Sequence, residues 1–128
     1  MNQSTLKELH LHGQTGQLAD QIIQHWLLGI RETNPAILDM FRDRDHRPYR
    51  DLLPWSGEFA GKYLTSCAYM YRLTGNKELY AYACDFIDEL LQYQAVDGYL
   101  GCFAENCHLT GAYSQNPAHT GLTWDSWA

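Results

Sequence analysis

The chain has 128 residues, a formal net charge of −6 and 45% hydrophobic residues. This length holds one domain at most, with enough mass for a core, and the composition indicates neither disorder nor a membrane span. The acidic balance argues against a nucleic-acid partner, because such a partner needs a basic face that replaces phosphate counterions.

The first fifteen residues predict an extended arm over 1–15, since Leu6, Leu9 and Leu11 alternate with polar residues before Gly13. They show no charged-then-apolar signal pattern, so we expect a cytoplasmic protein. A helix is predicted from Gln17 to Arg31 and a short one from Pro35 to Phe41. The apolar face of the longer helix comprises Leu18, Ile22, Ile23, Trp26, Leu27 and Ile30.

Residues 42–53 predict irregular chain in which basic and acidic residues alternate. Such a run favours a solvated loop, with a phosphate site as the less favoured alternative. The residues concerned are Arg42, Arg44, Arg47 and Arg50 with Asp43, Asp45 and Asp51.

The best helix signal covers 56–74, where Ser56 is a candidate cap and Glu58 complements the helix dipole. Its wide apolar stripe predicts a helix covered on most sides. We expect Lys62 to pair with Glu58 one turn away. The stripe comprises Phe59, Ala60, Tyr63, Leu64, Cys67, Ala68, Met70, Tyr71 and Leu73.

A second helix is predicted over 77–94 after a tight break, in which Gly75 ends the first helix and Asn76 caps the next. So short a turn forces an antiparallel pair. The start of the first helix and the end of the second then lie at one end. The apolar face of the second helix comprises Leu79, Ala83, Phe86, Ile87, Leu90 and Leu91.

The four cysteines divide into two groups. Cys67 and Cys84 fall on apolar helix faces and are predicted to be small core residues. Cys102 and Cys107, with His108 and His119 nearby, have a spacing that permits a metal pair, although two free thiols in a polar loop are the favoured interpretation.

The stretch after Gly101 is rich in Gly, Pro, Asn, Ser and Thr and predicts a long loop. It leads to Trp124-Asp125-Ser126-Trp127, which has the pattern of a cap and a first helical turn. We therefore expect residues 1–128 to form a single incomplete domain.

Four motifs in order carry a family resemblance. They are Leu53-Pro54-Trp55-Ser56-Gly57-Glu58-Phe59-Ala60-Gly61-Lys62, Leu73-Thr74-Gly75-Asn76, Gln94 with Asp97-Gly98-Tyr99-Leu100-Gly101, and Trp124-Asp125-Ser126-Trp127. From about Gly16 to Ala128 the chain resembles the N-terminal part of glycoside hydrolases of the β-L-arabinofuranosidase (family 127-like) type. The resemblance implies an all-α fold of antiparallel helical hairpins that forms part of an (α/α)6 barrel. It also implies hydrolysis of O-glycosyl bonds in plant-type or related oligosaccharides.

The resemblance further implies zinc in the full-length enzyme, where members of the family hold a cysteine nucleophile on the metal. Those positions lie further along the barrel, so no catalytic or metal residue is assigned in this chain. We expect the chain alone to be inactive.

A sugar site needs flat apolar faces for C–H surfaces and carboxylates or amides for hydroxyl groups. Glu58 and Asp97 also fit an acid/base pair. Each residue has a structural alternative: Glu58 on the helix dipole, Asp97 in its turn and Trp55 as a core anchor. The candidate substrate-binding residues are Trp55, Glu58, Gln94, Asp97, Tyr99, Trp124 and Asp125.

Two functions follow from these patterns. The first is a glycoside hydrolase portion that contributes one rim of a sugar cleft. The second is a free-standing helical module without catalytic activity, whose exposed aromatic residues bind another protein. In either case uncovered helix faces predict self-association.

Overall fold

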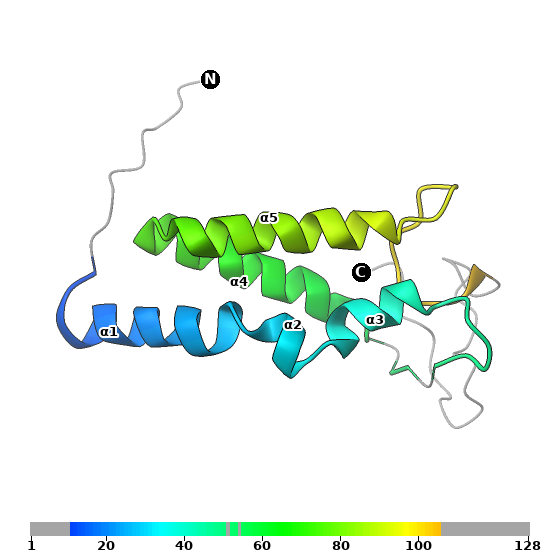
Figure 1. Ribbon diagram of the computed structural model, residues 1–128, viewed down its shortest axis with the longest axis horizontal. Coiled ribbons are helices and arrows are strands. Elements are labelled where there is room, and N and C mark those ends of the chain that lie inside the picture. The colour runs from blue at the N-terminus through cyan, green and yellow to red at the C-terminus, as the bar shows by residue number, and fades with distance from the viewer. Residues whose placement is uncertain (1–10, 51, 54, 106–128) are drawn as a thin grey trace, which may run out of the picture.

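A computed structural model describes residues 11–50, 52–53 and 55–105. Its helices form two parts that lie side by side (Figure 1). The first part is a broken rod of α1 (Gly13–Ile22), the π-helical segment η1 (Ile23–Leu27), α2 (Ile30–Thr33) and α3 (Ala36–Arg42). The second is a hairpin of α4 (Glu58–Thr74) and α5 (Lys77–Gln92). No strand occurs within the described ranges, so the all-α prediction is confirmed there.

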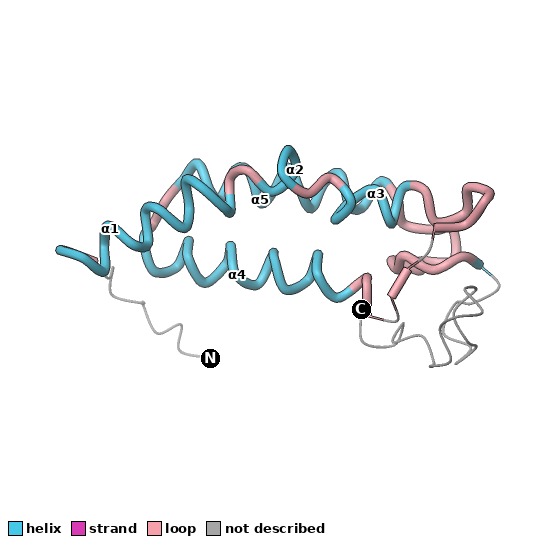
Figure 2. Tube along the Cα trace, turned by 90° about the horizontal axis from the view of Figure 1, so that it is seen from below, coloured by secondary structure: helices cyan, strands magenta, loops and turns pink. Residues whose placement is uncertain are grey.

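The hairpin turn matches the sequence prediction at both of its residues. Gly75 adopts a left-handed conformation with φ 67°, and its N–H donates to the Tyr71 carbonyl at 2.7 Å. The Asn76 side chain accepts a hydrogen bond from the Leu79 N–H at 2.9 Å. These contacts end α4 and start α5 within two residues. The hairpin is therefore antiparallel, and the start of α4 lies at the same end as the finish of α5 (Figure 2).

Two predicted boundaries of the hairpin were wrong. Ser56 does not cap α4, which begins at Glu58 after Gly57 and has no side-chain cap. Backbone carbonyls replace that cap, because Glu58 and Phe59 donate to the carbonyls of Trp55 and Ser56. At the other end, α5 stops at Gln92 rather than at 94, because the next two N–H groups bond three residues back to Leu90 and Leu91.

The first helix also differs from its prediction. It starts at Gly13, so residues 13–15 of the predicted extended arm are helical, whereas residues 1–10 lie outside the described chain. It is not continuous to Arg31, because a π-helical turn is followed by a break at Leu28 and Gly29. The short helix predicted over 35–41 is present as α3.

The core lies between the broken rod and the hairpin. Ala19, Ile23 and Leu27 face it at a spacing of four residues, and the predicted face residues Leu18 and Trp26 are more than half exposed. Leu18 directly precedes buried Ala19, and Trp26 directly precedes buried Leu27. One residue is a rotation of about 100° around the helix, so both side chains point away from the core. The largest fully buried side chains are Phe86, Ile23, Leu27, Leu79, Cys67 and Cys102.

The hairpin is less covered than its apolar stripe predicts. Tyr63 and Cys67 of α4 are buried, but Phe59 is 45% exposed. On α5, Ile87 and Leu91 remain 40% and 48% exposed beside buried Phe86 and Leu90. The expectation that α4 is covered on most sides is therefore wrong for the described chain. None of the described helices is long and apolar enough to cross a membrane.

Candidate functional site

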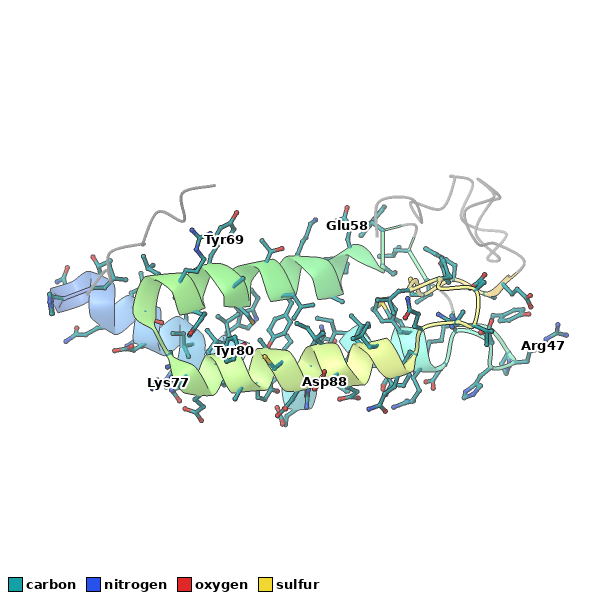
Figure 3. The ribbon with its side chains drawn as sticks, turned by 90° about the horizontal axis from the view of Figure 1, so that it is seen from above. Arg47, Glu58, Tyr69, Lys77, Tyr80 and Asp88 are labelled. Atoms are coloured by element: carbon teal, nitrogen blue, oxygen red, sulfur yellow. The ribbon has the colours of Figure 1, made fainter. Side chains whose placement is uncertain are left out.

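The candidate site lies at the end of the hairpin where α4 begins and α5 finishes. Figure 3 labels Glu58 at this end of α4, with Lys77 at the opposite end of the hairpin. The loop after α3 and the loop after α5 both gather there (Figure 1). Trp55 and Glu58 are at the start of α4, and Gln94, Asp97 and Tyr99 follow the end of α5. The antiparallel hairpin therefore places both groups at the same end.

Glu58 and Trp55 occupy the entry to α4. The Glu58 carboxylate forms an ion pair with Lys62 one turn further on, as the sequence predicts, and its side chain is 19% exposed. It also provides the negative charge in the first turn that the helix dipole favours. Trp55 is 39% exposed, so a large part of its indole faces solvent instead of serving only as a core anchor.

Gln94, Asp97 and Tyr99 belong to one tight turn after α5. The Gln94 Nε2 donates to the Gly98 carbonyl at 2.8 Å, and the Tyr99 N–H donates to Asp97 Oδ1 at 3.0 Å. Gly98 has φ 93°, a conformation that favours glycine. One oxygen of Asp97 therefore shapes the turn, while the side chain remains exposed at the surface.

An open depression of about 500 Å³ lies beside this turn. Three carboxylates and one guanidinium contribute to its walls, so it offers both acceptors and a donor to a polar ligand. Of the predicted site residues that the structure describes, Asp97 lines it, whereas Trp55, Glu58, Gln94 and Tyr99 do not. The lining residues are Arg44, Asp45, Ala95, Val96, Asp97 and Glu105.

Arg44 and Asp45 were not predicted as site residues, since the charged run around them favours a solvated loop. That interpretation is wrong for Arg44, whose side chain is only 8% exposed. Its Nη1 donates to the Gly101 carbonyl at 3.1 Å, and its guanidinium lies 5.5 Å from the centre of the Tyr99 ring. The sequence shows only that this charged run directly follows an amphipathic helix. That position does not reveal that Arg44 has a partner 57 residues away.

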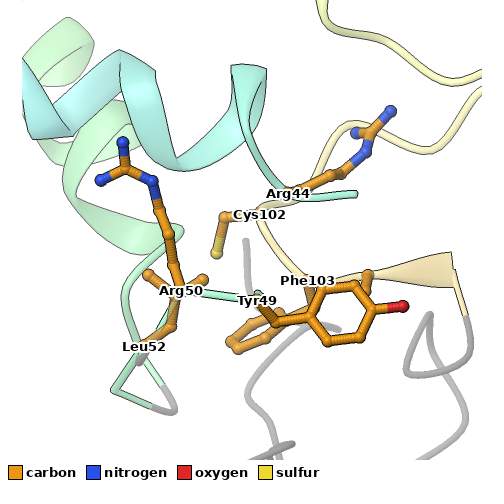
Figure 4. A pocket seen from close by; sticks show the side chains of 7 residues that line it. Arg44, Tyr49, Arg50, Leu52, Cys102 and Phe103 are labelled. Carbon is orange, nitrogen blue, oxygen red and sulfur yellow. The ribbon is translucent and has the colours of Figure 1, made fainter. Parts of the chain in front are cut away.

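Arg44 also lines a second, smaller pocket (Figure 4). Arg50 and the Cys102 thiol border it together with Tyr49 and Phe103. Arg50 is already paired with Asp43, and Arg44 with Asp45, so both cations have carboxylate partners. This pairing weighs against the phosphate site that the sequence left open.

The base of the charged loop is a compact ion-pair cluster around Asp43. The Arg42 Nε and Nη2 donate to its two oxygens at 2.8 and 3.0 Å, and Arg50 also donates to it. These hydrogen bonds, with that from Arg42 the strongest cause, hold the pKa of Asp43 well below its usual range. The cluster keeps Asp43 ionised and fixes the loop where it leaves α3.

The described residues contain only one member of the predicted cysteine-based metal pair and so do not test it. Cys102 is 1% exposed and packs into the hydrophobic core with Phe103. Cys107, His108 and His119 lie outside the described residues, as do Trp124 and Asp125. Across residues 11–50, 52–53 and 55–105 no three His, Cys, Asp or Glu side chains gather as a metal site would require. Within those ranges the structure therefore assigns no ligand to the zinc centre that the resemblance implies for the full-length enzyme.

Comparison with known proteins identifies the fold to which this arrangement belongs. The family model for the β-L-arabinofuranosidase, GH127 catalytic domain matches residues 11–125. The catalytic domain of that family is an (α/α)6 barrel, a closed ring of six helical hairpins. No match was found among curated proteins or among solved structures.

Proposed function

Because the chain belongs to the β-L-arabinofuranosidase family and covers part of its GH127 catalytic domain, we propose that its loop end forms one rim of the sugar cleft. The substrate class of this proposal is an oligosaccharide with L-arabinofuranosyl residues, of plant or related origin. The observation that carries it is the open depression beside Asp97, at the end of the hairpin where α4 begins and the motif over residues 94–101 follows α5.

The chemistry of this end suits a sugar. Asp45, Asp97 and Glu105 provide carboxylate acceptors for hydroxyl groups around the depression. At the entry to α4, the exposed part of the Trp55 indole is a flat apolar surface for C–H groups. In this proposal the described residues bind and orient the sugar, and bond cleavage is left to other parts of the catalytic domain.

A second candidate function is a helical module that binds another protein. It is favoured by the exposed apolar residues of α5, since Tyr80, Ile87 and Leu91 lie at spacings of seven and four on one face of that helix. The two functions differ in what they require of the loop end. A sugar rim needs Asp97, whereas docking through α5 does not.

The test of the sugar rim uses the whole catalytic domain that contains this chain. Asp97→Asn keeps an oxygen for the Tyr99 N–H and so preserves the turn, but it removes the negative charge. Glu58→Gln removes one side of an ion pair that involves an exposed lysine, which costs little stability. We expect both variants to weaken sugar affinity or turnover by about tenfold, the effect of losing one hydrogen bond to a charged group.

Glu78→Gln is the matched control, because this exposed carboxylate lies in the first turn of α5 at the opposite end of the hairpin. It should leave kinetics unchanged. Melting temperatures of all three variants should stay close to that of the wild type. Loss of stability with unchanged kinetics in Asp97→Asn and Glu58→Gln would make both residues structural and refute the proposal.

A further inference from the structure

The loop after α3 contacts the loop after α5 through one buried guanidinium, that of Arg44. A buried arginine is stable only when carboxylates, carbonyls or aromatic faces replace its water. Arg44 meets this need with the Gly101 carbonyl at 3.1 Å, the Asp45 carboxylate at 3.1 Å and the Tyr99 ring at 5.5 Å. Two of these three partners belong to the loop that carries Asp97.

The contact with Tyr99 is closely fitted. The Tyr99 side chain folds back over Gly101 so tightly that a β-carbon at Gly101 would collide with its phenol ring. Gly101 is itself buried, and its carbonyl is the acceptor for Arg44 Nη1. The guanidinium, the phenol and the glycine therefore form one packed unit, in which the planar fork of arginine cannot be replaced by the point charge of lysine.

Asp45 provides a second contact between the two loops, at Glu105. Its Oδ2 accepts from Arg44 Nε, while its Oδ1 accepts from the Glu105 N–H at 3.3 Å. The two neighbouring residues thus hold the loop at Tyr99–Gly101 and again at Glu105. The loop base is fixed in turn by the Asp43 cluster at the end of α3.

Both residues also line the depression that contains Asp97 and Glu105. We propose that Arg44 and Asp45 are positioning residues, which hold loop 95–105 in the conformation that presents Asp97 and Glu105 to a sugar. This inference rests on the sugar rim proposed above. It adds that the conformation of the rim depends on Arg44, which is 57 positions from its partner Gly101, and on Asp45, which is 60 positions from its partner Glu105.

The first arm of the test needs no sugar. Amide hydrogen exchange is measured in the 128-residue chain for the wild type, Arg44→Met, Arg44→Lys and Asp45→Ala. We expect the amide exchange rate in 95–105 to rise about tenfold in Arg44→Met and Asp45→Ala. Arg44→Met removes the donor to the Gly101 carbonyl, and Asp45→Ala removes the acceptor of the Glu105 N–H. Arg44→Lys should recover only part of the protection. Exchange in α4 and α5 should stay unchanged, which separates a freed loop from a destabilised fold.

Arg47→Met is the matched control, since Arg47 is exposed in the same loop and lies over Tyr49 instead of Tyr99. It should exchange as the wild type does. Unchanged exchange of 95–105 in Arg44→Met would overturn the positioning role, whatever the chain binds.

The second arm measures binding of methyl β-L-arabinofuranoside by the whole catalytic domain that carries the same substitutions. We expect affinity to fall about tenfold in Arg44→Met and less in Arg44→Lys, with Arg47→Met unchanged. A freed loop with unchanged affinity would overturn the inference and leave the sugar rim intact. A wild-type catalytic domain that does not bind the glycoside, although the loop is protected by Arg44, would contradict the proposed function and with it the role in sugar binding.

Discussion

The Tyr63 hydroxyl of α4 donates to the Leu27 carbonyl of η1 at 2.8 Å. In a continuous α-helix that carbonyl would pair with the Arg31 N–H four residues on. Here the Arg31 N–H instead donates to the Tyr82 hydroxyl of α5 at 3.4 Å. Two tyrosines of the hairpin therefore bond the two backbone groups that the helix break separates, and so join the broken rod to the hairpin.

Tyr63→Phe is expected to destabilise the chain by about 1 kcal/mol, because the Leu27 carbonyl would lose its buried donor while the ring packing on Phe86 is retained. Burial raises the pKa of Tyr63 well above its usual range, so the hydroxyl remains a donor throughout neutral pH. Urea unfolding measures the change. Exposed Tyr69→Phe is the control, and equal stability of both variants would contradict the bonding role.

Asp43→Asn is expected to lower stability by about 1 kcal/mol at neutral pH, as for a partly exposed ion-pair cluster. The folded-state pKa of Asp43 lies below the unfolded value of about 3.9. Its contribution is therefore fully present above that unfolded value and is lost as pH falls towards the folded value. The difference in melting temperature between wild type and variant should be constant from pH 8 to 5 and should shrink progressively below about pH 4. A difference that persists undiminished at pH 3 would refute the assignment.

Self-association of the isolated chain is expected through the uncovered face of α5. Tyr80, Ile87 and Leu91 are 53%, 40% and 48% exposed on one helical face, an apolar surface that monomers seldom leave in water. Sedimentation should show concentration-dependent association. Leu91→Glu should weaken it, whereas Ala81→Glu, at an exposed α5 position outside this face, should not. A wild-type chain that sediments as a monomer at every concentration would show the face to be inert.

Local signals predicted the hairpin well, but they did not predict the burial of Arg44 beside the candidate site. Gly75 and Asn76 act through their own backbone and side chain, so the turn between α4 and α5 could be inferred from neighbouring residues alone. At the break at Leu28 and Gly29, the backbone groups on either side bond to tyrosines far along the chain, and local periodicity does not indicate those partners. The same limit hid Arg44. Its charge indicates solvent, and only the distant Gly101 carbonyl and Tyr99 ring make its burial favourable.

An NMR titration of the whole catalytic domain that contains this chain with methyl β-L-arabinofuranoside tests most directly whether the loop end of the hairpin binds the sugar. Amide signals of loop 95–105 and of the first turn of α4 should shift in a saturable manner. Those of the opposite turn at Gly75 and Asn76 should not. Saturable shifts that centre on the opposite turn, or no shifts at any concentration of the glycoside, would contradict sugar binding at the loop end.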